Sequence, residues 1–239
     1  MTAILVTLCG RGGSKGIPGK NIKCLNGKPL IAYSIKHAKE FAKEYKNVDI
    51  VLSTDDEEIK EVAKENGLFS DYERPKDLAE DAVGKIDVLK HALEYQETKK
   101  NRKYDILLDL DITSPLRNLS DLKNAYTTLS KDSKAINLFS VSKPHKNPYF
   151  NVVEEKEDGY FKLVKPSDTK SRQSAPKVYD MNASFYFYRR TFFQQNLDSA
   201  ITDRSLIYVM NHVCFDLDEP IDFDIMEYLL TKQKLGFSL

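Results

Sequence analysis

Residues 3–21 read AILVTLCGRGGSKGIPGKN and join an apolar run to a glycine-rich, cationic loop. The run Ala3–Leu8 has the apolar and β-branched composition of a buried strand. The loop follows at once and carries Arg11, Lys15 and Lys20 among its glycines. Because ligands of open α/β sheets bind beyond the carboxyl ends of the strands, we expect this loop to face a ligand.

The composition of the loop indicates a polyphosphate. Glycines let the backbone approach a ligand and direct N–H groups at it, and the cations offset negative charge. The spacing excludes a P-loop, which requires GxxxxGK[ST]. It also excludes a dinucleotide fingerprint, because Lys15 stands where the third glycine of GxGxxG would fall. A glycine-rich surface turn with solvated cations remains the alternative interpretation.

Beyond this loop, apolar strand-like runs alternate with runs of helical period. We expect strands at 49–53, 105–111, 135–141, 185–188 and 213–215, and helices at 29–45, 55–66, 86–95, 121–129 and 221–232. This alternation predicts an α/β fold of three layers, with a mostly parallel sheet covered by helices on both faces. The length predicts a single domain over 1–239, in which the proline-punctuated residues 142–177 form an insertion or flap.

The charge balance and the cysteines exclude several functional classes. Lys plus Arg and Asp plus Glu both number 36, so the chain lacks the excess charge of a nucleic-acid coat or a polybasic membrane anchor. The cysteines, Cys9, Cys24 and Cys214, form no CxxC pair and predict neither a zinc site nor a disulfide framework. The apolar start is too short to span a bilayer and lacks the marks of a signal peptide, so we expect a cytoplasmic protein without membrane partners.

Two acidic pairs are candidates for a metal site. Asp216 and Asp218 follow the expected strand at 213–215, where period-two geometry would place both carboxylates on one face. Such a pair suits Mg²⁺, which binds carboxylates, waters and substrate phosphates. Asp109 and Asp111 end a central strand on the same sheet edge, and from the residues alone they stay open as an alternative.

The sequence resembles the acylneuraminate cytidylyltransferases along nearly its whole length. The first matching motif is Arg11-x-x-Ser14-Lys15-Gly16-Ile17-Pro18-x-Lys20-Asn21. Five further motifs follow in the family's order: Ser53-Thr54-Asp55; Arg74-Pro75 with Leu78-Ala79 and Asp81; Thr113-Ser114-Pro115-Leu116-Arg117; Ser171-Arg172-Gln173 through Asn182 and Tyr186; and Phe215-Asp216-Leu217-Asp218. One such motif is weak, whereas an ordered series is specific.

The resemblance implies an enzyme that transfers CMP from CTP to the anomeric hydroxyl of a nonulosonic acid and releases pyrophosphate. It implies catalytic roles for Arg11, Lys20, Asp216 and Asp218, with Mg²⁺ on the two aspartates. The implied nucleotide-binding residues are Arg11, Gly12, Gly13, Ser14, Lys15, Asn21, Arg74 and Asp81. The implied substrate-binding residues are Asp111, Thr113, Ser114, Arg172, Gln173, Asn182 and Tyr186. It further implies the nucleotidyltransferase form of the fold and a homodimer in which residues 142–177 pack against the partner.

The sugar half of the implied site departs from the sialic-acid enzymes. Asp111 stands where they usually have Gln, and Asp180-Met181-Asn182-Ala183 replaces an Arg-Pro-Asn-Gly stretch. Phe150 stands where a lysine is often found. These changes favour a relative with other sugar substituents, such as legionaminate. The alternatives are a CMP-Kdo synthetase, another sugar-nucleotide pyrophosphorylase, and a non-catalytic nucleotide-binding protein.

Overall fold

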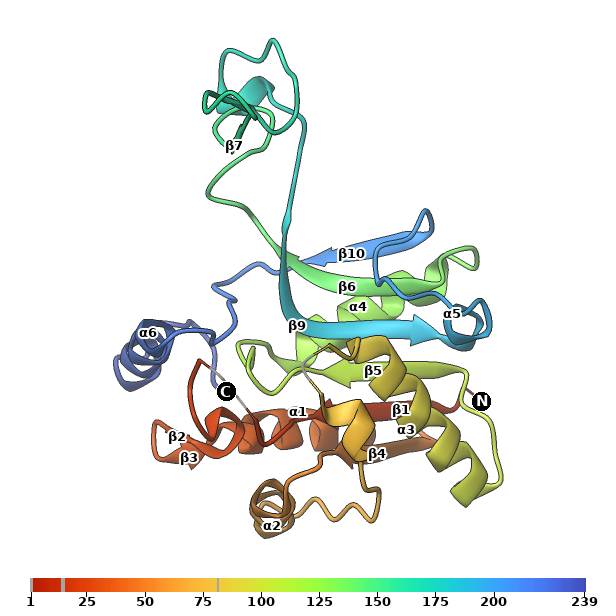
Figure 1. Cartoon of the computed structure of the whole chain (residues 1–239). Coiled ribbons are helices and arrows are strands. Elements are labelled where there is room, and N and C mark those ends of the chain that lie inside the picture. The colour runs from red at the N-terminus through yellow and green to blue at the C-terminus, as the bar shows by residue number, and fades with distance from the viewer. Residues whose placement is uncertain (1, 14–15, 81) are drawn as a thin grey trace.

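A six-stranded sheet forms the centre of the computed structural model, which describes residues 2–13, 16–80 and 82–239 (Figure 1). Its strand order is β10-β6-β9-β5-β1-β4. The strands are β1 (Ile4–Cys9), β4 (Val48–Ser53), β5 (Ile106–Leu110), β6 (Asn137–Ser142), β9 (Asp180–Arg189) and β10 (Ser205–Val209). Strand β9 runs antiparallel to both of its neighbours, and the other pairings are parallel, as the sequence predicted for most of the sheet.

Helices cover both faces of the sheet and make two separate apolar cores. The helices are α1 (Leu30–Glu44), α2 (Glu57–Glu65), α3 (Lys85–Lys100), α4 (Leu119–Lys131), α5 (Arg190–Gln194) and α6 (Pro220–Thr231). Buried residues of α1, α2, α4 and α6 share one core, and those of α3 and α5 share the other. Within β1, Ile4 and Val6 point into the first core and Leu5 into the second. The three-layer α/β fold is therefore confirmed.

Short 3₁₀ turns and two small hairpins lie between the main strands and helices. They are the 3₁₀ turns η1 (Lys20–Ile22), η2 (Lys76–Ala79) and η3 (Arg172–Ser174), and two small hairpins, β2 (Cys24–Leu25) with β3 (Lys28–Pro29) and β7 (Val153–Glu155) with β8 (Phe161–Leu163). The β2–β3 hairpin leads directly into α1, so the glycine-rich loop is held at both of its ends by regular structure.

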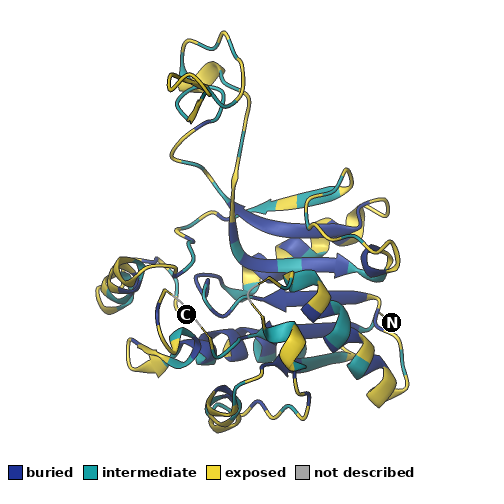
Figure 2. Ribbon diagram, viewed as in Figure 1, coloured by how far each residue is buried: buried dark blue, intermediate teal, exposed yellow. Residues whose placement is uncertain are grey.

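Residues 143–179 form an arm that leaves the sheet after β6 and returns as β9 (Figure 1). Its side chains are mostly exposed or half-buried (Figure 2). Hydrogen bonds from Asn147 to Pro176 O and from Arg172 to His145 O stay within the arm. The apolar side chains of Tyr160 and Phe161 are 72% and 64% exposed. Residues 143–179 are therefore set apart from the body of the molecule (Figure 1).

The expected strand at 213–215 is wrong, and the strand at that edge of the sheet is β10. Its residues Ser205–Val209 pair with β6 in parallel register and occupy the position next to it. Side-chain hydroxyls instead donate hydrogen bonds to backbone carbonyl oxygens in residues 213–215. Ser142 Oγ donates to Cys214 O, and Ser114 Oγ donates to Phe215 O. The period-two argument for Asp216 and Asp218 therefore fails, because no strand carries them.

Candidate active site

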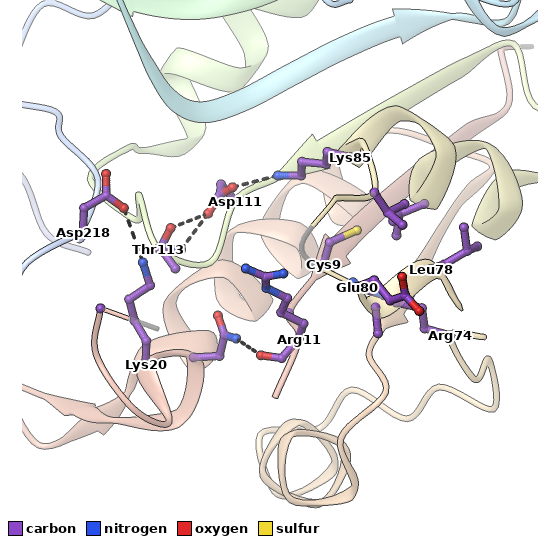
Figure 3. A pocket seen from close by; sticks show the side chains of 16 residues that line it. Cys9, Arg11, Lys20, Arg74, Leu78, Glu80, Lys85, Asp111, Thr113 and Asp218 are labelled. Atoms are coloured by element: carbon purple, nitrogen blue, oxygen red, sulfur yellow. Dashed lines mark hydrogen bonds and ion pairs between the residues drawn. The ribbon is translucent and has the colours of Figure 1, made fainter. Parts of the chain in front are cut away.

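A cavity of about 450 Å³ opens at the carboxyl ends of β1 and β5 (Figure 3). Its lining comes from the glycine-rich loop, the segment around η2, the start of α3, the turn after β5 and the segment before α6. The lining residues are Cys9, Gly10, Arg11, Gly16, Lys20, Asn21, Arg74, Leu78, Ala79, Glu80, Val83, Lys85, Val88, Asp111, Thr113 and Asp218. The cavity lies at the sheet edge where the sequence predicted a ligand.

The glycine-rich loop lies directly against the segment that carries the predicted acidic pair. Lys20 Nζ donates to the carbonyl oxygen of Leu217 and lies 3.5 Å from Asp218 Oδ1. A Cβ atom on Gly16 would lie 2.5 Å from the carbonyl oxygen of Asp218, so only glycine permits this approach. Two parts of the chain about 200 residues apart are thereby held together, with cations and carboxylates facing one cavity.

Asp216 and Asp218 have different environments. The Asp218 side chain is 71% exposed and lines the 450 Å³ cavity beside the glycine-rich loop, the main cavity. Asp216 lines a neighbouring cavity of about 670 Å³ with Asn182 and Lys143. Burial raises the pKa of Asp216, and the negative charges of Asp218 and Asp111 add to that rise. A bound cation would relieve this repulsion.

The carboxylates fit Mg²⁺ as partial ligands. Among the residues that the structure describes, no three His, Cys, Asp or Glu side chains converge as a closed metal cage. An ion that keeps several waters and binds substrate phosphates needs only one or two protein carboxylates. The donor set of Asp216 and Asp218 therefore suits Mg²⁺ held jointly with a nucleotide.

The alternative acidic pair already has a cation. Lys85 Nζ lies 2.7 Å from Asp109 Oδ2 and 2.7 Å from Asp111 Oδ2. Asp109 is fully buried and also accepts a hydrogen bond from Thr7 Oγ1. Asp111 Oδ1 accepts from the backbone N–H and the hydroxyl of Thr113. Burial opposes the ionisation of Asp111, but Lys85 and the Thr113 donors lower its pKa below the usual aspartate value.

The predicted nucleotide-binding residues that are described lie on two loops at the cavity. Asn21 is buried and donates to Arg11 O, which fixes the loop, and Gly12 N–H donates to Asp55 Oδ1. Arg74 is buried and donates to the hydroxyl and the carbonyl of Ser53. Arg11, Asn21 and Arg74 all line the cavity. Ser14, Lys15 and Asp81 lie outside the described residues.

The predicted substrate-binding residues divide into cavity-lining and supporting side chains. Asp111 and Thr113 line the main cavity. Ser114 is buried and donates to Asn182 O, while Asn182 donates to Ser142 Oγ and accepts from Ser140.

Tyr186 lies beside the Lys85 ammonium, which is 5.9 Å from the centre of its ring. Burial is the main cause that raises the pKa of Tyr186 to about 12. The phenol therefore stays neutral, and Tyr186 supplies an apolar wall behind the ammonium.

Arg172 and Gln173 lie elsewhere. They form part of η3 in the arm, outside the linings of both cavities, and Arg172 NH2 donates to His145 O. The position of Arg172 and Gln173 in the arm gives no support for a role at the cavity of their own chain. Their role as substrate ligands stays a prediction that requires a second chain.

No role was predicted from the sequence for two residues that support the site, Arg117 and Lys85. Arg117 is fully buried and donates to the carbonyl oxygens of Asp111, Ser114 and Ser184. Burial lowers its pKa to about 10. Lys85 was missed because a lysine at a helix start usually faces solvent. The feature that could have indicated a role for Lys85 is its position at the N-terminus of a helix. A cation is unfavourable there, so its presence indicates a role other than stabilising the helix.

The fold and the cavity together define a three-layer α/β protein whose ligand site lies where a glycine-rich cationic loop faces carboxylates across a sheet edge. Residues 5–233 match the cytidylyltransferase family. The chain belongs to this family, whose members are enzymes.

Several known proteins are similar over nearly the full length. The chain is 40% identical over 236 residues to post-translational flagellin modification protein B of Campylobacter coli, with 98% of each chain covered. It is 39% identical over 237 residues to a CMP-N,N′-diacetyllegionaminic acid synthase of Campylobacter jejuni, covering 99% of this chain and 98% of that one. Pseudaminic acid cytidylyltransferase of the same species is 33% identical over 222 residues, with 92% of each chain covered.

A solved structure shares the fold at low sequence identity. It is a CMP:2-keto-3-deoxy-manno-octonic acid synthetase complexed with CTP, with a TM-score of 0.69 and 15% identity. The superposition covers 97% of this chain and 100% of that one. In the described part of this chain, every helix is too short or too polar to cross a bilayer.

Proposed function

We propose that the protein transfers CMP from CTP to the anomeric hydroxyl of a nonulosonic acid. The observation that carries the proposal is the contact between the two ends of the chain. Lys20 of the glycine-rich loop reaches Leu217 and Asp218, so cationic and acidic groups face one cavity. Relatives that match along nearly the full length bear the names of CMP-legionaminic acid and pseudaminic acid enzymes.

The nucleotide would lie along the cavity with its base near η2. Leu78 and Ala79 supply apolar lining there, and Arg74 is held in place by Ser53. The triphosphate would then extend toward Arg11, Gly12 and Lys20. The positive charges of Arg11 and Lys20 would neutralise the phosphates and stabilise the leaving pyrophosphate.

The reaction joins the hydroxyl oxygen to the α-phosphorus of CTP. The bond between the α-phosphorus and the oxygen that bridges it to the β-phosphorus breaks, pyrophosphate leaves, and the proton of the hydroxyl is released to solvent water. Asp216 and Asp218 would hold Mg²⁺, which supplies charge neutralisation for the phosphates and lowers the pKa of a coordinated hydroxyl. Positioning of the two substrates and electrostatic stabilisation account for the rest of the catalysis.

The sugar acid proposed here is legionaminate-like. Support comes from the named relatives and from Asp111, Asp180 and Phe150, which differ from the sialic-acid pattern. We also propose a cytoplasmic homodimer in which the arm reaches the partner's site, because the arm holds Arg172 and Gln173 away from the cavity of their own chain.

The test is release of pyrophosphate from CTP and Mg²⁺ with a panel of nonulosonic acids, and detection of the CMP-sugar by mass. The panel includes the eight-carbon acid Kdo, because the CTP-bound structural neighbour is named for that substrate. Turnover of Kdo alone would replace the nonulosonate proposal. CTP binding without turnover of any acid would indicate a nucleotide-binding protein instead.

A substitution in the acidic pair gives a first prediction. Asp218→Asn should lower kcat by about 100-fold or more while the protein stays folded, since removal of one preorganised charge costs about that much. The control is Asp224→Asn, the same chemical change on the exposed face of α6. Near-normal turnover by Asp218→Asn would remove Asp218 from the mechanism.

A further inference from the structure

Lys85 occupies a position that helix stability does not explain. It is the first residue of α3, after Gly84, which provides no side-chain cap. Backbone N–H groups concentrate partial positive charge at a helix N-terminus, where an added cation is unfavourable. The ammonium is turned toward Asp109 and Asp111 and lines the main cavity (Figure 3).

The two carboxylates bind Lys85 in different ways. Lys85 donates to Asp111 Oδ2 at 2.7 Å in good hydrogen-bond alignment. Asp109 Oδ2 is at ion-pair distance but outside hydrogen-bond alignment. Asp109 is fully buried, whereas the side chains of Asp111 and Lys85 are 18% and 37% exposed. Lys85 therefore neutralises a buried carboxylate and still reaches the cavity.

The partially exposed pair retains hydrogen-bonding capacity. An ammonium carries three N–H donors, and a carboxylate has about four acceptor sites. Oδ1 of Asp111 accepts two hydrogen bonds from Thr113, and Oδ2 accepts one from Lys85. The pair can thus offer the cavity one donor and one acceptor side by side, as a primary carboxamide would, but with charge on each partner.

We propose that Lys85 and Asp111 together determine specificity for the sugar acid. They would recognise a substituent that presents a hydrogen-bond acceptor next to a donor, either an acylamino group or two neighbouring hydroxyls. The acceptor would contact Lys85 Nζ, and the donor would contact Asp111 Oδ2. This inference rests on the proposed function, because it assigns the substituent that the same site distinguishes.

The experiment compares the wild type with Asp111→Gln, Lys85→Met and the double variant. Each single substitution should lower kcat/KM for the preferred sugar acid by roughly 10- to 100-fold, the range for a hydrogen bond to a charged group. The KM for CTP should change by less than about threefold. The double variant should lose less than the product of the single losses, because a glutamine amide alone supplies a donor and an acceptor without leaving Asp111 as an unpaired charge.

Specificity is measured with sugar acids that lack one group at a time. The wild type should lose about tenfold or more when the recognised group is removed, and Asp111→Gln should show a smaller loss, because its neutral amide replaces the carboxylate that would accept from the substituent. A loss with the deacylated compound identifies the acylamino group, and a loss with a deoxy compound identifies the hydroxyls. If the variants keep the wild-type ratio between compounds, the pair is structural and the proposal is overturned.

The controls separate folding and function. Lys85→Met leaves Asp109 buried without its cation and can unfold the protein, whereas Asp111→Gln keeps the Lys85–Asp109 pair and remains informative. Lys90→Met, farther along α3 with its ammonium on Asn196, should match the wild type. Absence of wild-type turnover with every acid would refute the proposed function, whereas wild-type turnover with unchanged variants would refute only the role of the Lys85–Asp111 pair.

Discussion

At the scale of single residues, Lys20 and Asp216 show how opposite charges are divided around the cavity. Lys20 is 15% exposed, and its ammonium is held by Leu217 O and the carboxylate of Asp218. Asp216 has a raised pKa because it is partly desolvated and lies near the negative charges of Asp218 and Asp111. The site therefore contains a carboxylate whose ionised form is disfavoured in the folded protein.

The unfavourable ionisation of Asp216 makes the stability of the folded protein depend on pH. Its folded-state pKa lies above the unfolded one, so the folded protein loses stability as pH rises through that interval, and the full penalty applies at pH 7. Asp216→Asn should therefore raise Tm at pH 7 in the absence of metal and have little effect below the ordinary aspartate pKa. Asp224→Asn, the same chemical change at an exposed position of α6, is the control. A lower Tm of Asp216→Asn at pH 7 would contradict the assignment.

Ala183 is a second residue that stores strain. It has φ of 57°, in the left-handed region, at the irregularity where β9 shifts register against β6. The sialic-acid enzymes that this chain resembles have glycine there. Ala183→Gly should stabilise the protein by about 0.5–1 kcal/mol, measured by urea unfolding, because glycine removes the Cβ contact at this φ. Destabilisation would show that the neighbouring strands accommodate the methyl group without cost.

At the scale of elements, the close approach of the glycine-rich loop to residues 217–218 decides the shape of the cavity. Gly16 meets the Asp218 backbone, and Lys20 at the start of η1 meets Leu217. The contact involves backbone atoms, so neither segment can yield by rotating a side chain. The distance between the cationic and acidic groups depends on the absence of a Cβ at position 16.

Gly16→Ala should separate the loop from residues 217–218 and lower kcat/KM for CTP by roughly tenfold or more, since small misplacements of binding groups are costly in catalysis. Steady-state kinetics at several CTP concentrations measure this effect. Gly84→Ala is a control in a neighbouring loop, because its Cβ would meet Asp87 at an ordinary 3.6 Å. Equal activities of the two variants would show that the Gly16 contact does not shape the site.

The elements also show where prediction from sequence succeeds. Strands such as β1 and helices such as α1 were expected within one or two residues, because their apolar periods are long and undisturbed. Residues 213–215 are apolar enough for a strand, but sheet pairing depends on a partner. The only place beside β6 at that edge of the described sheet is taken by β10. Local composition cannot resolve such a competition.

At the scale of the whole molecule, a single chain does not explain why the arm of residues 143–179 projects from the body. It extends from the body, exposes Tyr160 and Phe161, and makes internal hydrogen bonds such as that from Asn147 to Pro176 (Figures 1 and 2). Exposed apolar side chains on a projecting segment are typical of a surface that another protein covers. A second copy of the chain is the proposed partner.

Replacement of residues 149–174 by two glycines tests this assembly. The body should keep its Tm within a few degrees, because the arm's hydrogen bonds remain inside it. The shortened protein should elute as a monomer and lose most CMP transfer, whereas the full chain elutes as a dimer. Light scattering coupled to chromatography gives both masses. A dimeric shortened protein, or a fully active monomeric full chain, would exclude the arm as the dimer contact.

Local patterns alone indicated the alternating strands and helices, the ligand edge after β1 and the motifs of the cytidylyltransferase family. They did so because period and glycine spacing are properties of neighbouring residues, and the order of the motifs along the chain resembles that of the family. Only the tertiary structure decided which acids face the cavity, since Lys85 binds Asp109 and Asp111 while Asp218 meets Lys20. These pairings join positions 24 to 198 residues apart. No local pattern encodes them, because the crossing of the chain over the sheet determines which charges meet.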